Sequence, residues 1–260
     1  MPGAVRHWGP PEGMPAVLVH CTLAHAGAWR GLAGALPDRR LVALDLPGHG
    51  ANPPWTPEAG DLHDLATADL AGVIAAEGRP VHLVGHSFGA TVALRLALER
   101  PETVASLTLI EPVLFALVRP GGSDPAHHGF EAAWARGDRE GTARAFLAIW
   151  GAGEDWDSLP DRQRAYLLDR IHLVAAQNPV LRDDRPGLLR PGRMEAMTRP
   201  TLLVAGGASP PIAREIVAEL GRRLPDARVE IVPDAGHMLP VTHAAPLAAR
   251  LGAFWAEAEA

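Results

Sequence analysis

VHLVGHSFGATVAL, residues 81–94, joins a short apolar run to a helical pattern through the sequence G-x-S-x-G, formed by Gly85, Ser87 and Gly89. The first half predicts a buried strand, and the second half predicts the start of a helix. In so abrupt a turn, glycine on either side of the serine removes side chains that would collide. We therefore expect Ser87 at a helix N-terminus, where backbone N–H groups favour developing negative charge.

The rest of the chain alternates short apolar runs with helical patterns. Continuous apolar runs of this length are typical of strands that are covered on both faces, as in a parallel sheet. Helical patterns at residues 91–100 and 211–224 lie between such runs and imply right-handed crossovers. This order predicts an α/β fold with a doubly wound, mostly parallel sheet. The expected strands are residues 16–20, 41–45, 81–85, 107–111, 201–206 and 229–234.

The alternation stops between residues 113 and 198, where the chain becomes helical and rich in aromatic residues. We therefore divide the chain into an α/β core of residues 1–112 and 199–260 and an inserted helical cap of residues 113–198. Residues 159–177 predict one helix with Pro160 in its first turn. We expect most cap aromatics to form the core of the cap, and one or two to face a ligand. Among these aromatics are Phe130, Trp134, Phe146, Trp150, Trp156 and Tyr166.

Composition excludes several classes of protein. With 47% hydrophobic residues and a formal net charge of −6, the 260 residues predict a globular protein and give no reason to expect nucleic acid or a membrane as partner. All 24 basic residues are arginine, so there is no lysine to attach pyridoxal phosphate or to complete a P-loop. Cys21 is the only cysteine, and no apolar run suits a signal peptide or a membrane helix. We expect a cytoplasmic protein without a cofactor.

Three further motifs, together with the G-x-S-x-G segment, resemble the α/β-hydrolase superfamily. VHCTLAHAGAW (19–29) resembles its His-Gly loop, LDLPGHG (44–50) its Asp-x-Pro-Gly-His-Gly turn, and PDAGHMLP (233–240) the turn that carries its catalytic histidine. The resemblance spans nearly the whole chain apart from the cap. It implies that Ser87 is a nucleophile in a strand-turn-helix context.

A serine nucleophile needs a base, and twelve histidines are candidates. His237 follows a strand and a glycine near the C-terminus, which is where the superfamily has its base. We expect the histidines in a turn, on a strand or beside the nucleophile to be structural, namely His49, His82 and His86. We expect those without a motif to be solvated, namely His127, His128, His172 and His243.

The acid is the least regular part of the expected triad. The superfamily most often has an aspartate about four residues after the strand that here reads TLLVAGG, where this chain has Ser209. Some members, including haloalkane dehalogenases, have the acid at the end of the strand after the nucleophile helix, where this chain has Glu111. Asp234 is a rival, but it would have to fold back within its own turn to reach His237. We predict a triad of Ser87, Glu111 and His237, in the superfamily's order of serine, acid and base.

The oxyanion of an acyl-transfer reaction needs two backbone donors. The resemblance implies the N–H of Phe88, directly after the nucleophile, and an N–H from the loop after His20, which we assign to Thr22. The superfamily usually has glycine where this chain has Cys21. A zinc site formed by His20, Cys21 and His25 matches no recognised ligand spacing, so we expect no metal.

These features predict a serine hydrolase that cleaves a carboxylic ester of a small, apolar acyl substrate in a pocket roofed by the cap. A serine nucleophile argues against epoxide hydrolases and dehalogenases, which attack with aspartate. Carbon–carbon bond hydrolases, thioesterases and some lyases use the same fold and triad, and a non-catalytic binding protein that has lost the usual acid is a second class of alternative. The side chains expected at the substrate are His25, Met238, Trp134, Trp150 and Phe88.

Overall fold

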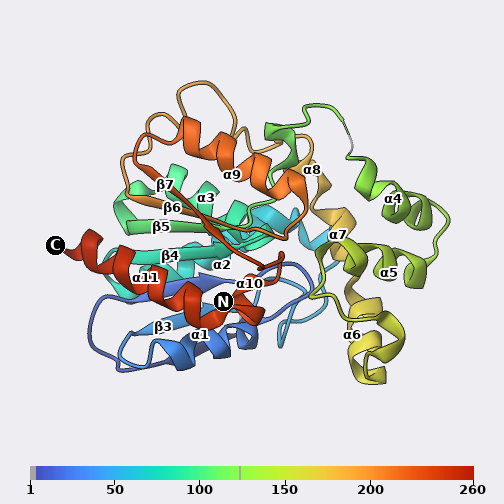
Figure 1. Cartoon of the computed structure of the whole chain (residues 1–260), viewed down its shortest axis with the longest axis horizontal. Helices are drawn as coiled ribbons and strands as arrows, with labels where there is room; N and C mark the ends of the chain where they lie inside the picture. Colours follow the sequence, from blue (N-terminus) through green and yellow to red (C-terminus); the bar gives the residue numbers. More distant parts are fainter. Residues whose placement is uncertain (1–3, 123) are drawn as a thin grey trace.

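The computed structural model describes residues 4–122 and 124–260, which form a seven-stranded sheet with helices on both faces (Figure 1). The strand order is β1-β3-β2-β4-β5-β6-β7. β1 is antiparallel to β3, and all other neighbouring pairs are parallel. The predicted doubly wound, mostly parallel sheet is therefore confirmed. The strands are β1 (Val5–Trp8), β2 (Ala16–Val19), β3 (Leu41–Leu44), β4 (Val81–His86), β5 (Val104–Ile110), β6 (Thr201–Gly206) and β7 (Ala227–Val232).

The two faces of the sheet pack against different helices because side chains alternate along each strand. Val17 and Val19 belong to the apolar cluster that includes α2, α3 and α9, whereas Ala16 and Leu18 belong to the cluster that includes α1 and α11. Full burial of such a valine or leucine stabilises the fold by about 1.5–3 kcal/mol. The helices are α1 (Arg30–Ala35), α2 (Leu62–Glu77), α3 (Phe88–Glu99), α4 (His128–Ala135), α5 (Arg139–Trp150), α6 (Asp161–Arg170), α7 (His172–Ala176), α8 (Asn178–Leu181), α9 (Pro211–Arg223), α10 (Leu239–Thr242) and α11 (Ala244–Glu259).

Short 3-10 helices occupy several connections between these elements. They are η1 (Ala26–Trp29), η2 (Pro57–Ala59), η3 (Pro101–Thr103), η4 (Phe115–Leu117), η5 (Pro125–His127) and η6 (Trp156–Ser158). Within residues 4–122 and 124–260, no helix combines the length and the apolar character needed to cross a membrane.

Strand β1 is not among the strands expected from the sequence. It lies at the edge of the sheet and pairs with β3 alone. Its middle residues, Arg6 and His7, are exposed, so VRHW carries no continuous apolar run. Charged side chains are common on edge strands, so an edge strand can lack an apolar pattern.

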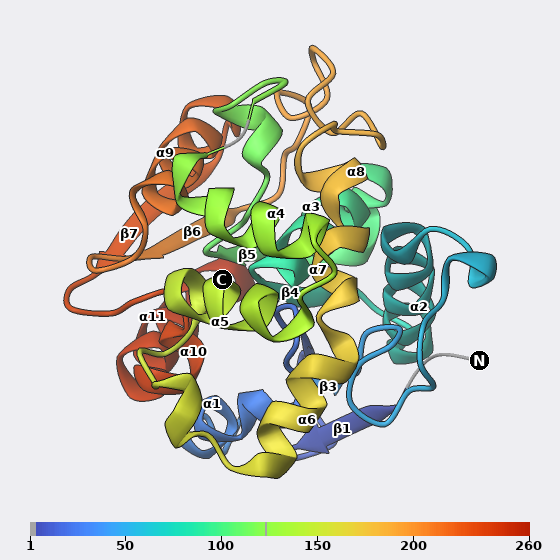
Figure 2. The same ribbon diagram turned by 90° about the vertical axis from the view of Figure 1, so that its right-hand side faces the viewer.

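The segment between β5 and β6 forms a helical insertion that contains α4 to α8. It lies at one end of the sheet, and Figure 2 shows it turned toward the viewer, in front of the strands. Phe130 and Trp156 pack in its own apolar cluster, as expected for most of its aromatics. The single helix expected over residues 159–177 is wrong: α6 and α7 are separate and meet at Ile171, which is fully buried in that cluster, and Pro160 is the N-cap of α6.

Three histidines of the core, His20, His49 and His63, are buried almost completely. Burial is the main cause that lowers the pKa of His20 to about 4 and the pKa of His49 and His63 to about 3, from an ordinary value of 6.5. Desolvation disfavours the charged imidazolium, so these rings are neutral in the folded protein. Between these values and 6.5, the unfolded chain therefore binds more protons than the folded one.

We expect the free energy of unfolding to fall as the pH drops through 6.5 toward the folded-state pKa values of about 3 to 4. Each buried histidine should contribute a slope of about 1.4 kcal/mol per pH unit in this window and none above it, since stability rises with pH wherever the unfolded state binds more protons. Urea unfolding at a series of pH values measures the slope. His63→Gln should lower the slope by the contribution of one buried histidine, about 1.4 kcal/mol per pH unit. His128→Gln is the matched control, because His128 lies at an exposed position on α4. Equal slopes in all three proteins would contradict the expectation.

Candidate active site

Ser87 lies between the end of β4 and the start of α3 in a strained backbone conformation. Its φ of 56° and ψ of −119° are rare for a residue with a side chain, and such strain costs about 1–3 kcal/mol. Its N–H donates to the carbonyl of Ile110 at 2.9 Å. A Cβ on Gly85 would lie 2.4 Å from the carbonyl oxygen of Gly89, and a Cβ on Gly89 would lie 2.4 Å from that of His20. Both glycines are therefore required, because backbones pack directly against one another around the serine.

Glu111 follows β5 directly and is fully buried. Its Oε2 atom lies 3.0 Å from Nδ1 of His237, which is also buried, and its Oε1 atom accepts the N–H of Gly206 at 2.6 Å. Its own N–H donates to the carbonyl of Val204 at 2.8 Å, and its φ of 51° lies in the left-handed region. Because a buried carboxylate is costly unless it is paired and hydrogen-bonded, this arrangement holds both oxygens in fixed directions.

The two other candidate positions for the acid do not contribute a carboxylate to His237. Ser209 is buried, and its Oγ atom has no hydrogen-bond partner in the described part of the chain. Asp234 is exposed. The structure thus brings Glu111 to His237 across 126 positions of sequence.

The loop after β2 is held by His20. Its Nδ1 atom lies 2.7 Å from the carbonyl oxygen of Cys21, and its Nε2 atom accepts the N–H of Leu46 at 3.0 Å. Both ring nitrogens are therefore occupied, which is consistent with the neutral ring that burial favours. Burial also raises the pKa of the Cys21 thiol to about 12, so this side chain is an uncharged thiol. The next residue, Thr22, donates its hydroxyl to Oε1 of Gln177 on the cap at 2.8 Å.

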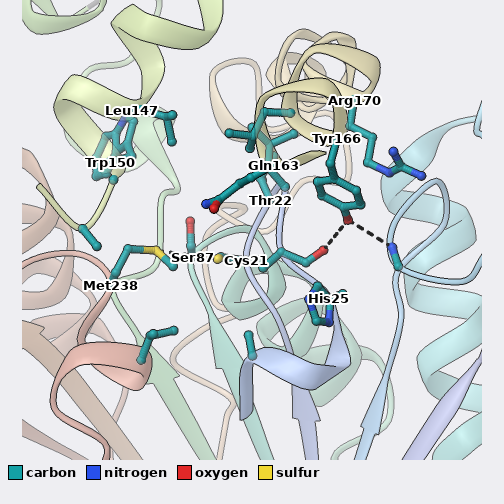
Figure 3. A pocket seen from close by; sticks show the side chains of 18 of the residues that line it. Cys21, Thr22, His25, Ser87, Leu147, Trp150, Gln163, Tyr166, Arg170 and Met238 are labelled. Atoms are coloured by element: carbon teal, nitrogen blue, oxygen red, sulfur yellow. Dashed lines mark hydrogen bonds between the residues drawn. The ribbon is translucent and has the colours of Figure 1, made fainter. Parts of the chain in front are cut away.

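A cavity of about 940 Å³, which we call the wide cavity, opens between the sheet and the cap. Ser87 and His237 line it from the core, and Trp150 and Tyr166 line it from the cap (Figure 3). The hydroxyl of Tyr166 donates to the carbonyl of Ala24 at 3.0 Å and accepts the N–H of Gly50 at 3.2 Å, which ties the cap to the core. The volume lies within the range of about 300–1,000 Å³ that is typical of small-molecule sites.

A second cavity of about 40 Å³, which we call the narrow cavity, also reaches Ser87. Thr22 and Trp150 line both cavities, so the two spaces meet beside the serine. The walls of the narrow cavity are mostly apolar and aromatic, and Gln177 and His127 are among the polar residues on them.

The residues expected at the substrate fall into two groups. His25, Met238 and Trp150 line the wide cavity. The structure places the side chains of Trp134 and Phe88 elsewhere: Trp134 is 40% exposed on α4, and Phe88 is buried in the core, where its ring packs edge-on against His63 at 5.5 Å. Neither residue lines the wide or the narrow cavity.

The cap contributes more to the two cavities than the sequence predicted. Four of the six cap aromatics named above line a cavity, namely Phe130, Phe146, Trp150 and Tyr166, and Phe115 at the start of the cap lines the narrow cavity too. His127 was expected at the solvated surface, but it is buried on the narrow cavity and packs against Phe115 with ring centroids 5.0 Å apart. Gln177 has no signal in the sequence, because a single polar residue between helical stretches forms no motif.

The three other histidines discussed above have structural contacts. Nε2 of His86 lies 2.8 Å from the carbonyl oxygen of His237, so this ring supports the turn that carries His237. His49 bonds the carbonyl of Pro47 through Nδ1 at 2.9 Å, and His82 lies on β4 with Nδ1 2.8 Å from the hydroxyl of Ser106. These contacts agree with the structural roles predicted for them.

Comparison with known proteins agrees with this fold. Residues 16–250 match the model of the alpha/beta hydrolase family, and the chain belongs to that family. It is 31% identical to lipase LipV of Mycobacterium tuberculosis, over 95% of this chain and 97% of the lipase. It is 32% identical to a pimeloyl-[acyl-carrier protein] methyl ester esterase of Methylococcus capsulatus, over 89% of this chain and 91% of the esterase.

The fold also matches solved structures over nearly its whole length. The structure of a thermophilic esterase from Thermogutta terrifontis superimposes with a TM-score of 0.74 over 99% of this chain and 94% of the esterase, at 23% sequence identity. At this level of identity the match concerns the fold.

Proposed function

We propose that this member of the alpha/beta hydrolase family is a serine hydrolase that cleaves carboxylic esters through an acyl-enzyme. The observation that carries the proposal is the buried hydrogen bond between Glu111 and Nδ1 of His237, beside a cavity that Ser87 also lines. A carboxylate at Nδ1 selects the tautomer in which Nε2 is free to accept a proton. Ser87 then has a base in its own cavity, and Glu111 stabilises the imidazolium that forms.

The reaction runs in two halves. Oγ of Ser87 attacks the ester carbonyl carbon while Nε2 of His237 takes the hydroxyl proton, and the N–H groups of Phe88 and Thr22 stabilise the oxyanion. The tetrahedral intermediate collapses, the alcohol leaves with the proton returned by His237, and the acyl group stays on Ser87. Water then attacks the acyl-enzyme with His237 as base, which releases the carboxylic acid and restores the serine.

Two observations support an ester as the substrate. The narrow cavity has mostly apolar and aromatic walls, which suits an apolar acyl part, whereas the wide cavity also has charged residues on its wall. The relatives described above are a lipase and a methyl ester esterase by name. The strained conformation of Ser87 at the start of α3 further supports a nucleophile, because strain of this kind gathers at functional sites.

Reaction with a fluorophosphonate probe tests the proposal. We expect fast labelling of wild-type protein at Ser87, located by mass spectrometry of peptides, and no labelling of Ser87→Ala. A panel of p-nitrophenyl esters, thioesters and carbon–carbon bond substrates then ranks the reaction types by kcat/KM, and we expect the esters to lead. A properly folded wild-type protein that neither labels nor hydrolyses any ester would instead favour a non-catalytic binding protein.

A further inference from the structure

The two cavities that meet at Ser87 differ in their access to the base. His237 lines the wide cavity and is absent from the lining of the narrow one. On the proposed mechanism the leaving group must receive a proton from His237, so it has to lie within hydrogen-bond reach of that ring. This requirement places the alcohol part of the substrate in the wide cavity and the acyl part in the narrow cavity.

The size of the narrow cavity limits the acyl group. Its volume of about 40 Å³ is more than one water molecule needs but far below the volume of a typical ligand site. The surrounding side chains include Phe115, Phe130, Phe146 and Trp150, which are large and leave little room for rearrangement. The narrow cavity therefore suits an acyl chain of only a few non-hydrogen atoms.

One polar group on the wall of the narrow cavity lacks a partner. Gln177 is only 2% exposed, and its Oε1 atom accepts the hydroxyl proton of Thr22 at 2.8 Å. Its Nε2 atom is buried and has no hydrogen-bond partner among residues 4–122 and 124–260. A buried donor without a partner is costly, and most buried polar groups are paired. Gln177 thus offers a free N–H donor on a largely apolar wall, a short distance from Thr22 and the reacting serine.

We propose that Gln177 determines acyl specificity, by donating a hydrogen bond from Nε2 to an oxygen on a short acyl chain. The inference rests on the proposed esterase function and goes further by naming the substrate class. The acid part is short and carries an ether or ketone oxygen beyond the carboxyl group. The alcohol part is larger and lies in the wide cavity. Because Oε1 is engaged by Thr22, Nε2 is the amide atom that is left to contact a substrate.

Matched pairs of p-nitrophenyl esters test this inference. In the first pair, methoxyacetate has an ether oxygen where butyrate has a methylene, and the chain length is the same. In the second pair, 4-oxopentanoate has a ketone oxygen where 4-methylpentanoate has a methyl group. For each pair we measure the ratio of kcat/KM for the oxygen-bearing ester to that for its apolar partner. In Gln177→Met, which keeps the length of the side chain and removes the amide, we expect the ratio to fall about tenfold in at least one pair, which is what a single hydrogen bond accounts for. Intrinsic ester reactivity cancels, since the same esters are used with both proteins.

Gln163→Met is the matched control, because it makes the same chemical change at a residue that lines the wide cavity and not the narrow one. We expect it to leave the ratio as in the wild type. If Gln177→Met lowers kcat/KM equally for both members of each pair, Gln177 acts only by holding the loop of Thr22, and the specificity role is wrong. The specificity role is also wrong if the kcat/KM ratios of both pairs in Gln177→Met equal those of the wild type.

Chain length gives an independent readout. In the wild type we expect kcat/KM to fall at least tenfold from p-nitrophenyl butyrate to octanoate, because the extra methylenes overfill the narrow cavity. A preference for octanoate would contradict the assignment of the acyl group to that cavity. If ester hydrolysis depends on Ser87 but shows neither the change of ratio in Gln177→Met nor the fall from butyrate to octanoate, only this inference is overturned. Absence of all ester hydrolysis would overturn the proposed function.

Discussion

The Ser87→Ala variant should lose ester hydrolysis by roughly 10⁴-fold to 10⁶-fold in kcat, because it lacks the hydroxyl that forms the acyl-enzyme. Alanine keeps the Cβ atom and removes a single oxygen from a side chain that borders both cavities. We therefore expect no large cavity in the core and little change in melting temperature. Steady-state kinetics with p-nitrophenyl butyrate and a thermal melt of the same preparation measure both quantities.

Ser158→Ala is a suitable control for this variant. Ser158 is exposed on the cap and donates its hydroxyl to the carbonyl of Asp155 at 2.7 Å, outside both cavities. Its loss should leave kcat at the wild-type level. If Ser87→Ala retained wild-type kcat, the proposed nucleophile and the acyl-enzyme would both be wrong.

The Glu111→Gln variant should reduce kcat by about 10³-fold to 10⁴-fold, with little change in KM. The backbone N–H of Gly206 fixes which end of the new amide faces His237, since Oε1 already accepts that N–H at 2.6 Å. The amide NH₂ then points at Nδ1 of His237, where the carboxylate oxygen lay at 3.0 Å. Imidazole must accept this proton at Nδ1, so Nε2 carries the ring hydrogen and cannot take the proton of the serine. Glutamine has nearly the same volume and keeps the bond to Gly206, so the melting temperature should stay close to that of the wild type.

Asp234→Asn provides the matched comparison, because it makes the same chemical change in the turn that carries His237. Asp234 is exposed and does not bond the ring, so we expect kcat to be nearly unchanged. A Glu111→Gln enzyme with normal kcat beside an inactive Asp234→Asn enzyme would transfer the role of the acid to Asp234.

The acid of the triad was predicted from sequence motifs and from the order of serine, acid and base along the chain. Ser209 at the usual acid position and Glu111 at the end of a predicted strand already favoured Glu111 over Asp234. The sequence contained no sign of the bond from Gly206 to Oε1 or of the positive φ of Glu111, although together these determine where the carboxylate points. Both depend on how β5 and β6 pair, which is a contact between distant segments.

The cap shows the opposite case. Its aromatic composition predicted a roof over the site, but Trp134 lies exposed and His127 lies buried, the reverse of what was expected for each. Helical stretches without a clear apolar stripe leave the direction of each side chain open. Packing against the core then decides it, as the break between α6 and α7 at the buried Ile171 illustrates.

The sequence by itself determined the order of buried strands and helices, and the turn at Ser87, because these depend on local apolar patterns and on the small size of Gly85 and Gly89. It also placed His237 after a strand through a local motif. Only the tertiary structure decided that two cavities of very different size meet at Ser87, and that the free amide of Gln177 lies on the smaller one. The physical reason is that the shape of a cavity is set by side chains from segments far apart in the chain, whose distances no local pattern encodes.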